Sequence, residues 1–200
     1  MRKDAPLLLV IVLLTAPVSG SAEPGASQPA FEHVHALAFD AGGGTLWLGA
    51  HTGLYRSADN GRTWAKASLP VHDHGPDVMA VTAHPTEADV LYLGTHEVGV
   101  LKTIDGGKTW RAANRGLGGL DVHGLAIDPN APDKLHALVR ETGSGIYRTR
   151  TGAEGGWVRV DDGPPGETKM LASIKIPTGM GGIFLYAGTA EGLQRSPDCF

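Results

Sequence analysis

The sequence predicts an all-β fold made of repeated four-stranded antiparallel sheets, and three observations favour it. An eight-residue pattern, Ser/Thr-x-Asp-x-Gly-x-Thr-Trp, occupies residues 57–64 and recurs at 103–110, a period of about 46 residues. Glycines that begin an apolar segment keep that period, at Gly53, Gly99, Gly145 and Gly192. Short apolar runs bounded by Gly, Pro, Asp or Asn are typical of strands. A unit of this length matches one blade of a β-propeller.

Each unit contains three predicted strands and a shorter fourth after the tryptophan. The first strands are predicted at 34–39, 78–83, 122–127 and 170–176. The second strands follow at 46–49, 91–94, 135–138 and 185–188. The third strands follow at 53–57, 99–103, 145–149 and 192–196. No stretch keeps a 3.6-residue apolar period, so almost no helix is expected. The blades are predicted at about 33–67, 77–113, 121–160 and 169–200, with the last one incomplete.

The repeated pattern, called the octad below, resembles the Asp-box (BNR) repeat of sialidases, sortilin-type receptors and photosystem II assembly-factor-like propellers. The resemblance covers roughly residues 31–200. It weakens at 149–157, where Thr151 replaces the aspartate, and the fourth copy stops at residue 200. The resemblance implies a ring of about six or more blades. We therefore expect either a truncated chain, which we favour, or a ring completed by a second copy or a partner.

The octads are predicted to serve the fold rather than chemistry. Their aspartates are expected to accept hydrogen bonds from backbone N–H groups of their own loop. Their glycines are expected to take a positive φ, and their tryptophans to cover the base of the hairpin. The structural positions are Ser57, Asp59, Gly61 and Trp64 in the first octad and Thr103, Asp105, Gly107 and Trp110 in the second.

The amino terminus predicts export. Residues 1–22 are typical of a signal peptide, with Arg2 and Lys3, an apolar run and small residues before Glu23. Residues 23–32 are expected to form a flexible leader. The apolar run is too short to span a bilayer, so we expect a periplasmic or extracellular protein without a membrane anchor. The net charge of −4 and the lack of a basic stripe argue against a nucleic-acid partner.

Most of the histidines are predicted to share one rim of the propeller. Because strand direction alternates within a blade, the start of the first strand and the end of the second lie on the rim opposite the octad loops. This places together His33, His35, His51, His96, His123, His72 and His74. With Asp77 and Asp121 they form a ligand set suited to zinc, copper or nickel. The alternative is that these histidines only cap strand ends or line a wet channel.

Three functions remain open from the sequence. We favour an exported, non-catalytic binding or assembly module, with a protein partner or self-association through open blade edges. A periplasmic metal-binding protein is the second. A sialidase-like glycoside hydrolase is disfavoured because Arg56, Arg148 and Arg195 hold equivalent third-strand positions instead of forming a cluster.

Overall fold

The computed structural model describes residues 29, 31–70, 76–160, 167–177 and 183–196. The predicted signal peptide, most of the predicted leader, His72 and His74 lie outside these residues. The described residues contain no helix. Within them, therefore, no helix is long and apolar enough to cross a membrane.

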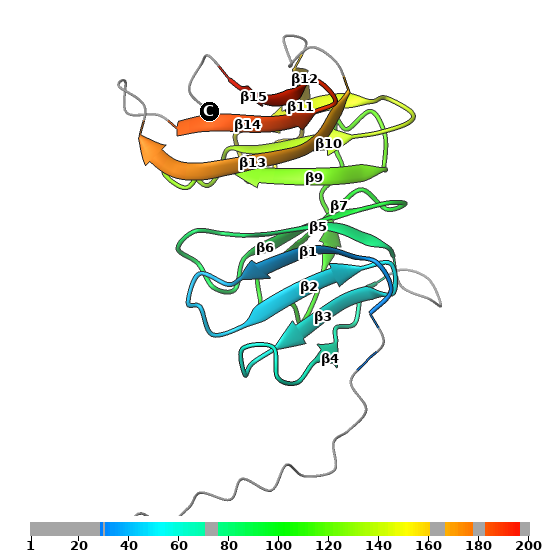
Figure 1. Cartoon of the computed structure of the whole chain (residues 1–200), viewed down its shortest axis with the longest axis vertical. Helices are drawn as coiled ribbons and strands as arrows, with labels where there is room; N and C mark the ends of the chain where they lie inside the picture. Colours follow the sequence, from blue (N-terminus) through cyan, green and yellow to red (C-terminus); the bar gives the residue numbers. More distant parts are fainter. Residues whose placement is uncertain (1–28, 30, 71–75, 161–166, 178–182, 197–200) are drawn as a thin grey trace, which may run out of the picture.

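The strands form four antiparallel sheets, each in chain order (Figure 1). The first sheet contains β1 (Val34–Phe39), β2 (Leu46–Ala50), β3 (Gly53–Ser57) and β4 (Ala65–Lys66). The second contains β5 (Val78–Ala83), β6 (Leu91–Thr95), β7 (Val100–Thr103) and β8 (Arg111–Ala112). The third contains β9 (Val122–Ile127), β10 (Leu135–Val139), β11 (Gly145–Thr149) and β12 (Val158–Val160). The described part of the fourth contains β13 (Thr168–Pro177), β14 (Ile183–Thr189) and β15 (Gly192–Arg195).

The four sheets are arranged as consecutive blades of a propeller, which confirms the predicted fold class. Strands β1, β5, β9 and β13 are innermost, and each contacts the next along the chain. The second strands β2, β6 and β10 also contact the innermost strand of the following blade. Among the described residues, no comparable contact joins β13 back to β1. The described blades therefore form an arc of an open ring.

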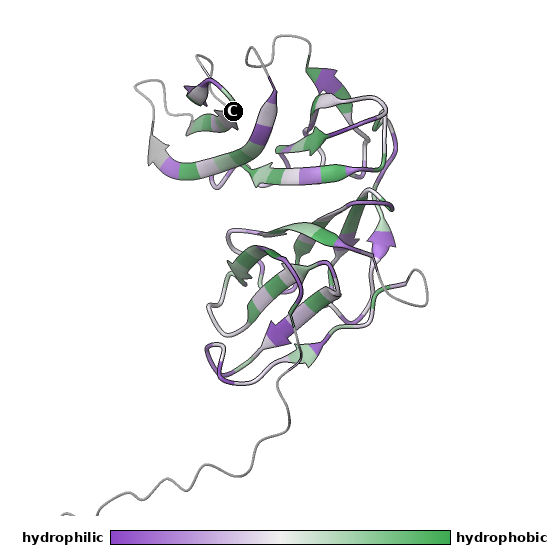
Figure 2. Cartoon of the chain, turned by 45° about the vertical axis from the view of Figure 1, so that its right-hand side comes forward, coloured by the Kyte–Doolittle hydropathy of each residue, from purple (hydrophilic) through white to green (hydrophobic). Residues whose placement is uncertain are grey.

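The core lies between the blades. Trp47, Val78, Leu91 and Trp110 belong to one buried cluster that joins the first two blades. A second cluster, which includes Tyr92 and Leu125, joins blades two and three. Figure 2 shows hydrophobic bands along the strands and mostly polar colour in the loops. Burying one large apolar side chain stabilises a fold by about 1.5–3 kcal/mol, so each blade depends on its neighbour.

The outer side of β1 differs from that of the other innermost strands. Leu37 is 60% exposed and Phe39 is 52% exposed. The corresponding Val81 and Leu125 in blades two and three are buried against the preceding blade. No described blade lies against β1, so its apolar face stays open. Further out, the ring of Phe31 covers part of the same face of blade one by packing edge-on against Tyr55 and Trp64.

The octad loops are organised by their own side chains. Oδ1 of Asp59 accepts hydrogen bonds from the backbone N–H of Thr63 at 2.8 Å and from the Ser57 hydroxyl at 2.7 Å. The side-chain and backbone hydrogen bonds from Thr63 lower the pKa of Asp59 to about 2. Gly61 has a φ of 84°. These are the loop contacts that the sequence predicts.

The second octad repeats this geometry and reaches across to the preceding blade. Asp105 accepts the Thr109 N–H at 2.9 Å, and Gly107 has a φ of 79°. The Trp110 ring meets Trp47 of blade one edge to face, with centroids 6.3 Å apart. The tryptophan thus joins two blades, a contact that the sequence did not predict. In the degenerate third copy, Thr151 Oγ1 accepts the Gly155 N–H at 2.6 Å in place of a carboxylate.

Candidate functional site at the histidine edge

The described candidate histidines lie at the edge of the blades opposite the octads. In blades one and two, the first residue of the innermost strand pairs with the last residue of the second strand, as Val34 with Ala50 and Val78 with Thr95. Ser57, where the first octad begins, pairs with Leu46 at the other end of the sheet. The edge where innermost strands begin, called the histidine edge below, is at the right in Figure 1.

A β-bulge recurs at the start of every innermost strand. The register shifts between Val34 and Ala36, and it shifts at the same place in β5, β9 and β13. The extra residues are His35, Met79, His123 and Lys169. A bulge turns its extra side chain away from the regular alternation of the strand. It thereby lets His35 and His123 face groups at the edge of the sheet.

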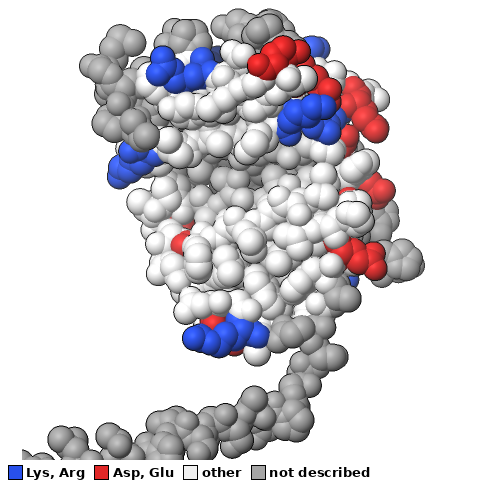
Figure 3. All heavy atoms as spheres, in the orientation of Figure 1, with Lys and Arg blue, Asp and Glu red and all other residues white. Residues whose placement is uncertain are grey.

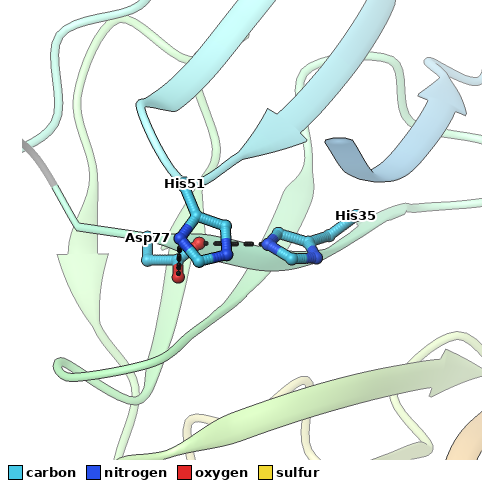
Figure 4. Close-up of side chains that lie close together, drawn as sticks. All are labelled: His35, His51 and Asp77. Carbon is cyan, nitrogen blue, oxygen red and sulfur yellow. Dashed lines mark ion pairs between the residues drawn. The ribbon is translucent and has the colours of Figure 1, made fainter. Parts of the chain in front are cut away.

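The first junction cluster consists of His35, His51 and Asp77 (Figure 4). His35 comes from the β1 bulge, His51 follows β2, and Asp77 precedes β5 in the next blade. Nε2 of His35 lies 3.5 Å from Oδ1 of Asp77, and Nδ1 of His51 lies 3.3 Å from Oδ2. The cluster therefore joins blade one to blade two. His33 lies beside it, with its ring centroid 4.7 Å from that of His51.

The second junction cluster consists of His96, Asp121 and His123 and joins blade two to blade three. His96 follows β6 as His51 follows β2, and Asp121 precedes β9 as Asp77 precedes β5. Nε2 of His123 lies 2.8 Å from Oδ1 of Asp121, and Nδ1 of His96 lies 3.9 Å from the same oxygen. The seven histidines predicted to share one rim thus form two separate groups, as far as they are described.

Burial lowers the pKa of one histidine in each cluster. Burial lowers the pKa of His35, an effect that the carboxylate of Asp77 opposes. Burial likewise lowers the pKa of His123, with Asp121 opposing it. Oδ1 of Asp77 and Oδ1 of Asp121 are both buried, and neither accepts an aligned hydrogen bond from a described residue. Burying a carboxylate oxygen is costly unless a donor or a cation faces it, and the imidazole nitrogens of His35 and His123 are the groups that face these two oxygens.

The third junction has a different composition. Arg140 follows β10, in the position of His51 and His96, and Glu167 precedes β13, in the position of Asp77 and Asp121. The hydrogen bond and charge of Lys169 lower the pKa of Glu167, and Arg140 adds to that effect. A permanent guanidinium therefore replaces the imidazoles at this junction. Glu167 is not among the residues predicted from the sequence, although its position directly before the fourth innermost strand matches that of Asp77 and Asp121 in the repeat.

An open hollow of about 660 Å³ lies at the second and third junctions. It is lined by His96, Asp121, His123, Leu138, Val139, Arg140, Glu141, Ser144, Gly145, Ile146, Val160, Glu167 and Thr168. Residues of the second strands explain why the hollow lies at these junctions. Gly49 and Gly94 let β2 and β6 approach the next blade so closely that an added Cβ would lie 2.8 Å from a backbone oxygen. Leu138 holds that place in β10 and lines the hollow.

The other two histidines have separate environments. Nδ1 of His84 accepts the backbone N–H of Glu87 at 3.0 Å, so His84 organises its own turn. His136 is buried in β10, and that burial lowers its pKa to about 4.

On the face seen in Figure 3, acidic side chains gather toward the right-hand, histidine edge. Such a concentration of negative charge favours cations at that edge.

Comparison with known proteins finds similarity in structure alone. No family model matches the chain, and no curated protein matches it. Among solved structures, an ancestral GH74 enzyme superposes with a TM-score of 0.61 over 84% of this chain at 16% identity. The extracellular domain of a one-component system from B. thetaiotaomicron gives 0.58 over 84% at 20% identity. YCF48 bound to D1 peptide gives 0.53 over 82% at 18% identity. These structures are β-propellers.

The chain has a β-propeller fold. It spans 24% of the GH74 chain, 21% of the extracellular domain and 48% of the YCF48 chain. At these identities the likeness establishes the fold and leaves activity, substrate and partner to be argued from the site.

Proposed function

We propose that this β-propeller is an exported, non-catalytic binding module that holds a segment of a partner protein in the hollow at its histidine edge. The hollow itself carries the proposal. Its volume of about 660 Å³ lies within the range of about 300–1,000 Å³ that is usual for binding sites. Its lining combines the apolar side chains of Ile146 and Val160 with the charged groups of Arg140 and Glu167.

Arg140 supplies the specific chemistry. Its Nε is buried and donates no hydrogen bond to a described residue. Leaving such a donor without an acceptor costs about 1–3 kcal/mol. A carboxylate accepts paired hydrogen bonds from a guanidinium and would remove this cost. We therefore expect a segment with an acidic side chain or a terminal carboxylate, next to an apolar residue that rests on Ile146 and Val160.

Two fold relatives support a binding role. YCF48 is a propeller seen bound to a peptide, and the B. thetaiotaomicron domain is extracellular. For the glycoside hydrolase alternative, the likeness to the ancestral GH74 enzyme supports only the fold, because the chain spans about a quarter of that enzyme's length. Assays of polysaccharide hydrolysis test that alternative directly.

Peptide selection tests the binding proposal. We expect a display library of random short peptides, selected on the immobilised full chain, to yield sequences that contain an acidic residue beside an apolar one. Fluorescence anisotropy of the best synthetic peptide should show binding that weakens at least about tenfold in Arg140→Ala, because a hydrogen bond to a charged group contributes about 1.5–3 kcal/mol.

Lys108→Ala is the matched control, because Lys108 lies in the second octad at the opposite edge. It should leave the affinity unchanged. Selection of no peptide, or equal binding by the Arg140→Ala variant, would show that the hollow is not the binding site.

Export is tested at the amino terminus. Residues 1–22 are expected to be removed by signal peptidase, which cleaves after small residues such as Ala22. Mass spectrometry of protein recovered from the periplasm or medium should then find Glu23 as the first residue. Accumulation of the uncleaved chain in the cytoplasm would contradict the proposal.

A further inference from the structure

We propose that each of the two junction clusters binds one divalent transition-metal ion, with zinc as the first candidate. The first ion would be held by His35, His51 and Asp77. The second would be held by His96, Asp121 and His123. Two imidazole nitrogens and one carboxylate are a usual protein ligand set for zinc, with the fourth position left to water.

The spacing of the donor atoms fits such an ion. In each cluster the three donor atoms all lie within 4.8 Å of one another. Ligand atoms around a tetrahedral zinc ion are about 3.4 Å apart when each bond is about 2.1 Å long. In the first cluster, the nitrogens lie 3.5 and 3.3 Å from the Asp77 oxygens. In the second, they lie 2.8 and 3.9 Å from Oδ1 of Asp121.

The unsatisfied carboxylates point independently to a cation. Oδ1 of Asp77 and Oδ1 of Asp121 are buried and lack an aligned hydrogen bond among the described residues. The Asp121 side chain is only 10% exposed. Two buried carboxylate oxygens thus lie at equivalent places, each facing imidazole nitrogens: Oδ1 of Asp77 is 3.5 Å from Nε2 of His35, and Oδ1 of Asp121 is 2.8 Å from Nε2 of His123. A metal ion would satisfy the oxygen and both nitrogens of each cluster.

The third junction supplies an internal comparison. There Arg140 provides a permanent positive charge near Glu167, and the β13 bulge carries Lys169 instead of histidine. At the corresponding positions the first junction carries His51 and Met79 and the second carries His96 and His123, so neither has an arginine or lysine there. The second imidazole of the first junction, that of His35, comes from the β1 bulge of the preceding blade. The repeat thus pairs the acidic residue with a side-chain cation at one junction and with metal-ligating groups at the other two.

The ligands of each ion come from two blades. Asp77 belongs to the second blade and faces two histidines of the first, whereas His96 belongs to the second blade and faces Asp121 and His123 of the third. Bound metal would therefore fasten consecutive blades together. Since it binds only the folded arrangement, it should also raise the melting temperature.

Calorimetry with zinc alone tests the proposal on the full chain without an affinity tag. After removal of metal with EDTA, titration with zinc should give two sites per chain. Asp77→Asn and Asp121→Asn should each remove one site, and the double variant should remove both. Each substitution should weaken its own site by at least about tenfold, because even outer-shell changes cost about 10–100-fold in metal affinity.

Two measurements distinguish a variant that has lost a metal ligand from a variant that no longer folds. Circular dichroism of each metal-free variant checks the fold, since asparagine keeps the shape of the side chain. Zinc should raise the melting temperature of the wild-type chain and fail to raise that of the double variant. The His136→Gln variant controls for other histidines, because His136 lies within β10 and belongs to neither cluster, and it should keep both sites. Unchanged stoichiometry in the aspartate variants, or loss of zinc binding in the histidine control, would overturn the proposal.

Discussion

At the scale of single residues, the surroundings of a histidine decide what it can do. His136 lies in the middle of β10, and burial lowers its pKa to about 4. His84 uses its ring to accept backbone N–H groups. His35 and His123 lie on bulges beside buried carboxylates. The described histidines therefore divide by environment into structural and candidate functional groups.

His136 makes stability depend on pH. The unfolded chain binds a proton at His136 below its ordinary pKa of about 6.5, whereas the folded chain binds it only near 4. Stability is therefore full above about pH 6.5 and falls as the pH drops toward 4. At about pH 5 the loss due to this residue should reach about 2 kcal/mol.

Urea denaturation at about pH 7.5 and about pH 5 measures this loss. The His136→Gln variant should lose less stability between the two pH values than the wild-type chain, because all other titrating groups are the same in both. Equal losses in the two proteins would show that His136 does not carry the effect.

At the scale of elements, strand positions could be predicted but bulges could not. The period of the octads and the short apolar runs placed every innermost strand to within about two residues, because alternation and turn residues are local signals. A bulge depends on the pairing of two strands, so nothing local marks His35 or His123 as the extra residue. These bulges bring His35 to Asp77 of the following blade and His123 to Asp121 at the start of its own strand.

The close approach of strands from neighbouring blades also could not be predicted from the sequence. Gly94 reads as an ordinary small residue at the end of a strand, yet a Cβ there would lie 2.8 Å from the carbonyl oxygen of Val122 in the next blade. Leu138 at the corresponding place in β10 marks the junction where the hollow opens. The hollow could be located only once the blades were placed side by side.

Gly94→Ala should therefore weaken the packing of blade two against blade three. We expect a loss of about 1–3 kcal/mol of unfolding free energy, the usual cost of inserting atoms into a packed interior. Thermal and urea denaturation measure it. Gly44→Ala is the matched control, since a Cβ at Gly44 meets nothing within 4 Å. If both variants are equally stable, the blades do not need this close contact.

At the scale of the whole molecule, the two edges of the propeller have different roles. The octad edge is held by local hydrogen bonds around Asp59 and Asp105. The histidine edge gathers the junction clusters and the hollow. The two edges therefore correspond to two sets of positions in the repeat. The positions at the octad edge keep their structural residues, whereas the positions at the histidine edge vary from blade to blade. The binding role and the metal sites are proposals for this second edge.

Anomalous X-ray diffraction tests the metal sites most directly. Crystals of the full chain grown with zinc would be measured on both sides of the zinc absorption edge. We predict two strong anomalous peaks per chain, one among His35, His51 and Asp77 and the other among His96, Asp121 and His123. A map without peaks at these two places, whether empty or with zinc bound elsewhere, would contradict the proposal that the histidine edge binds metal at its blade junctions.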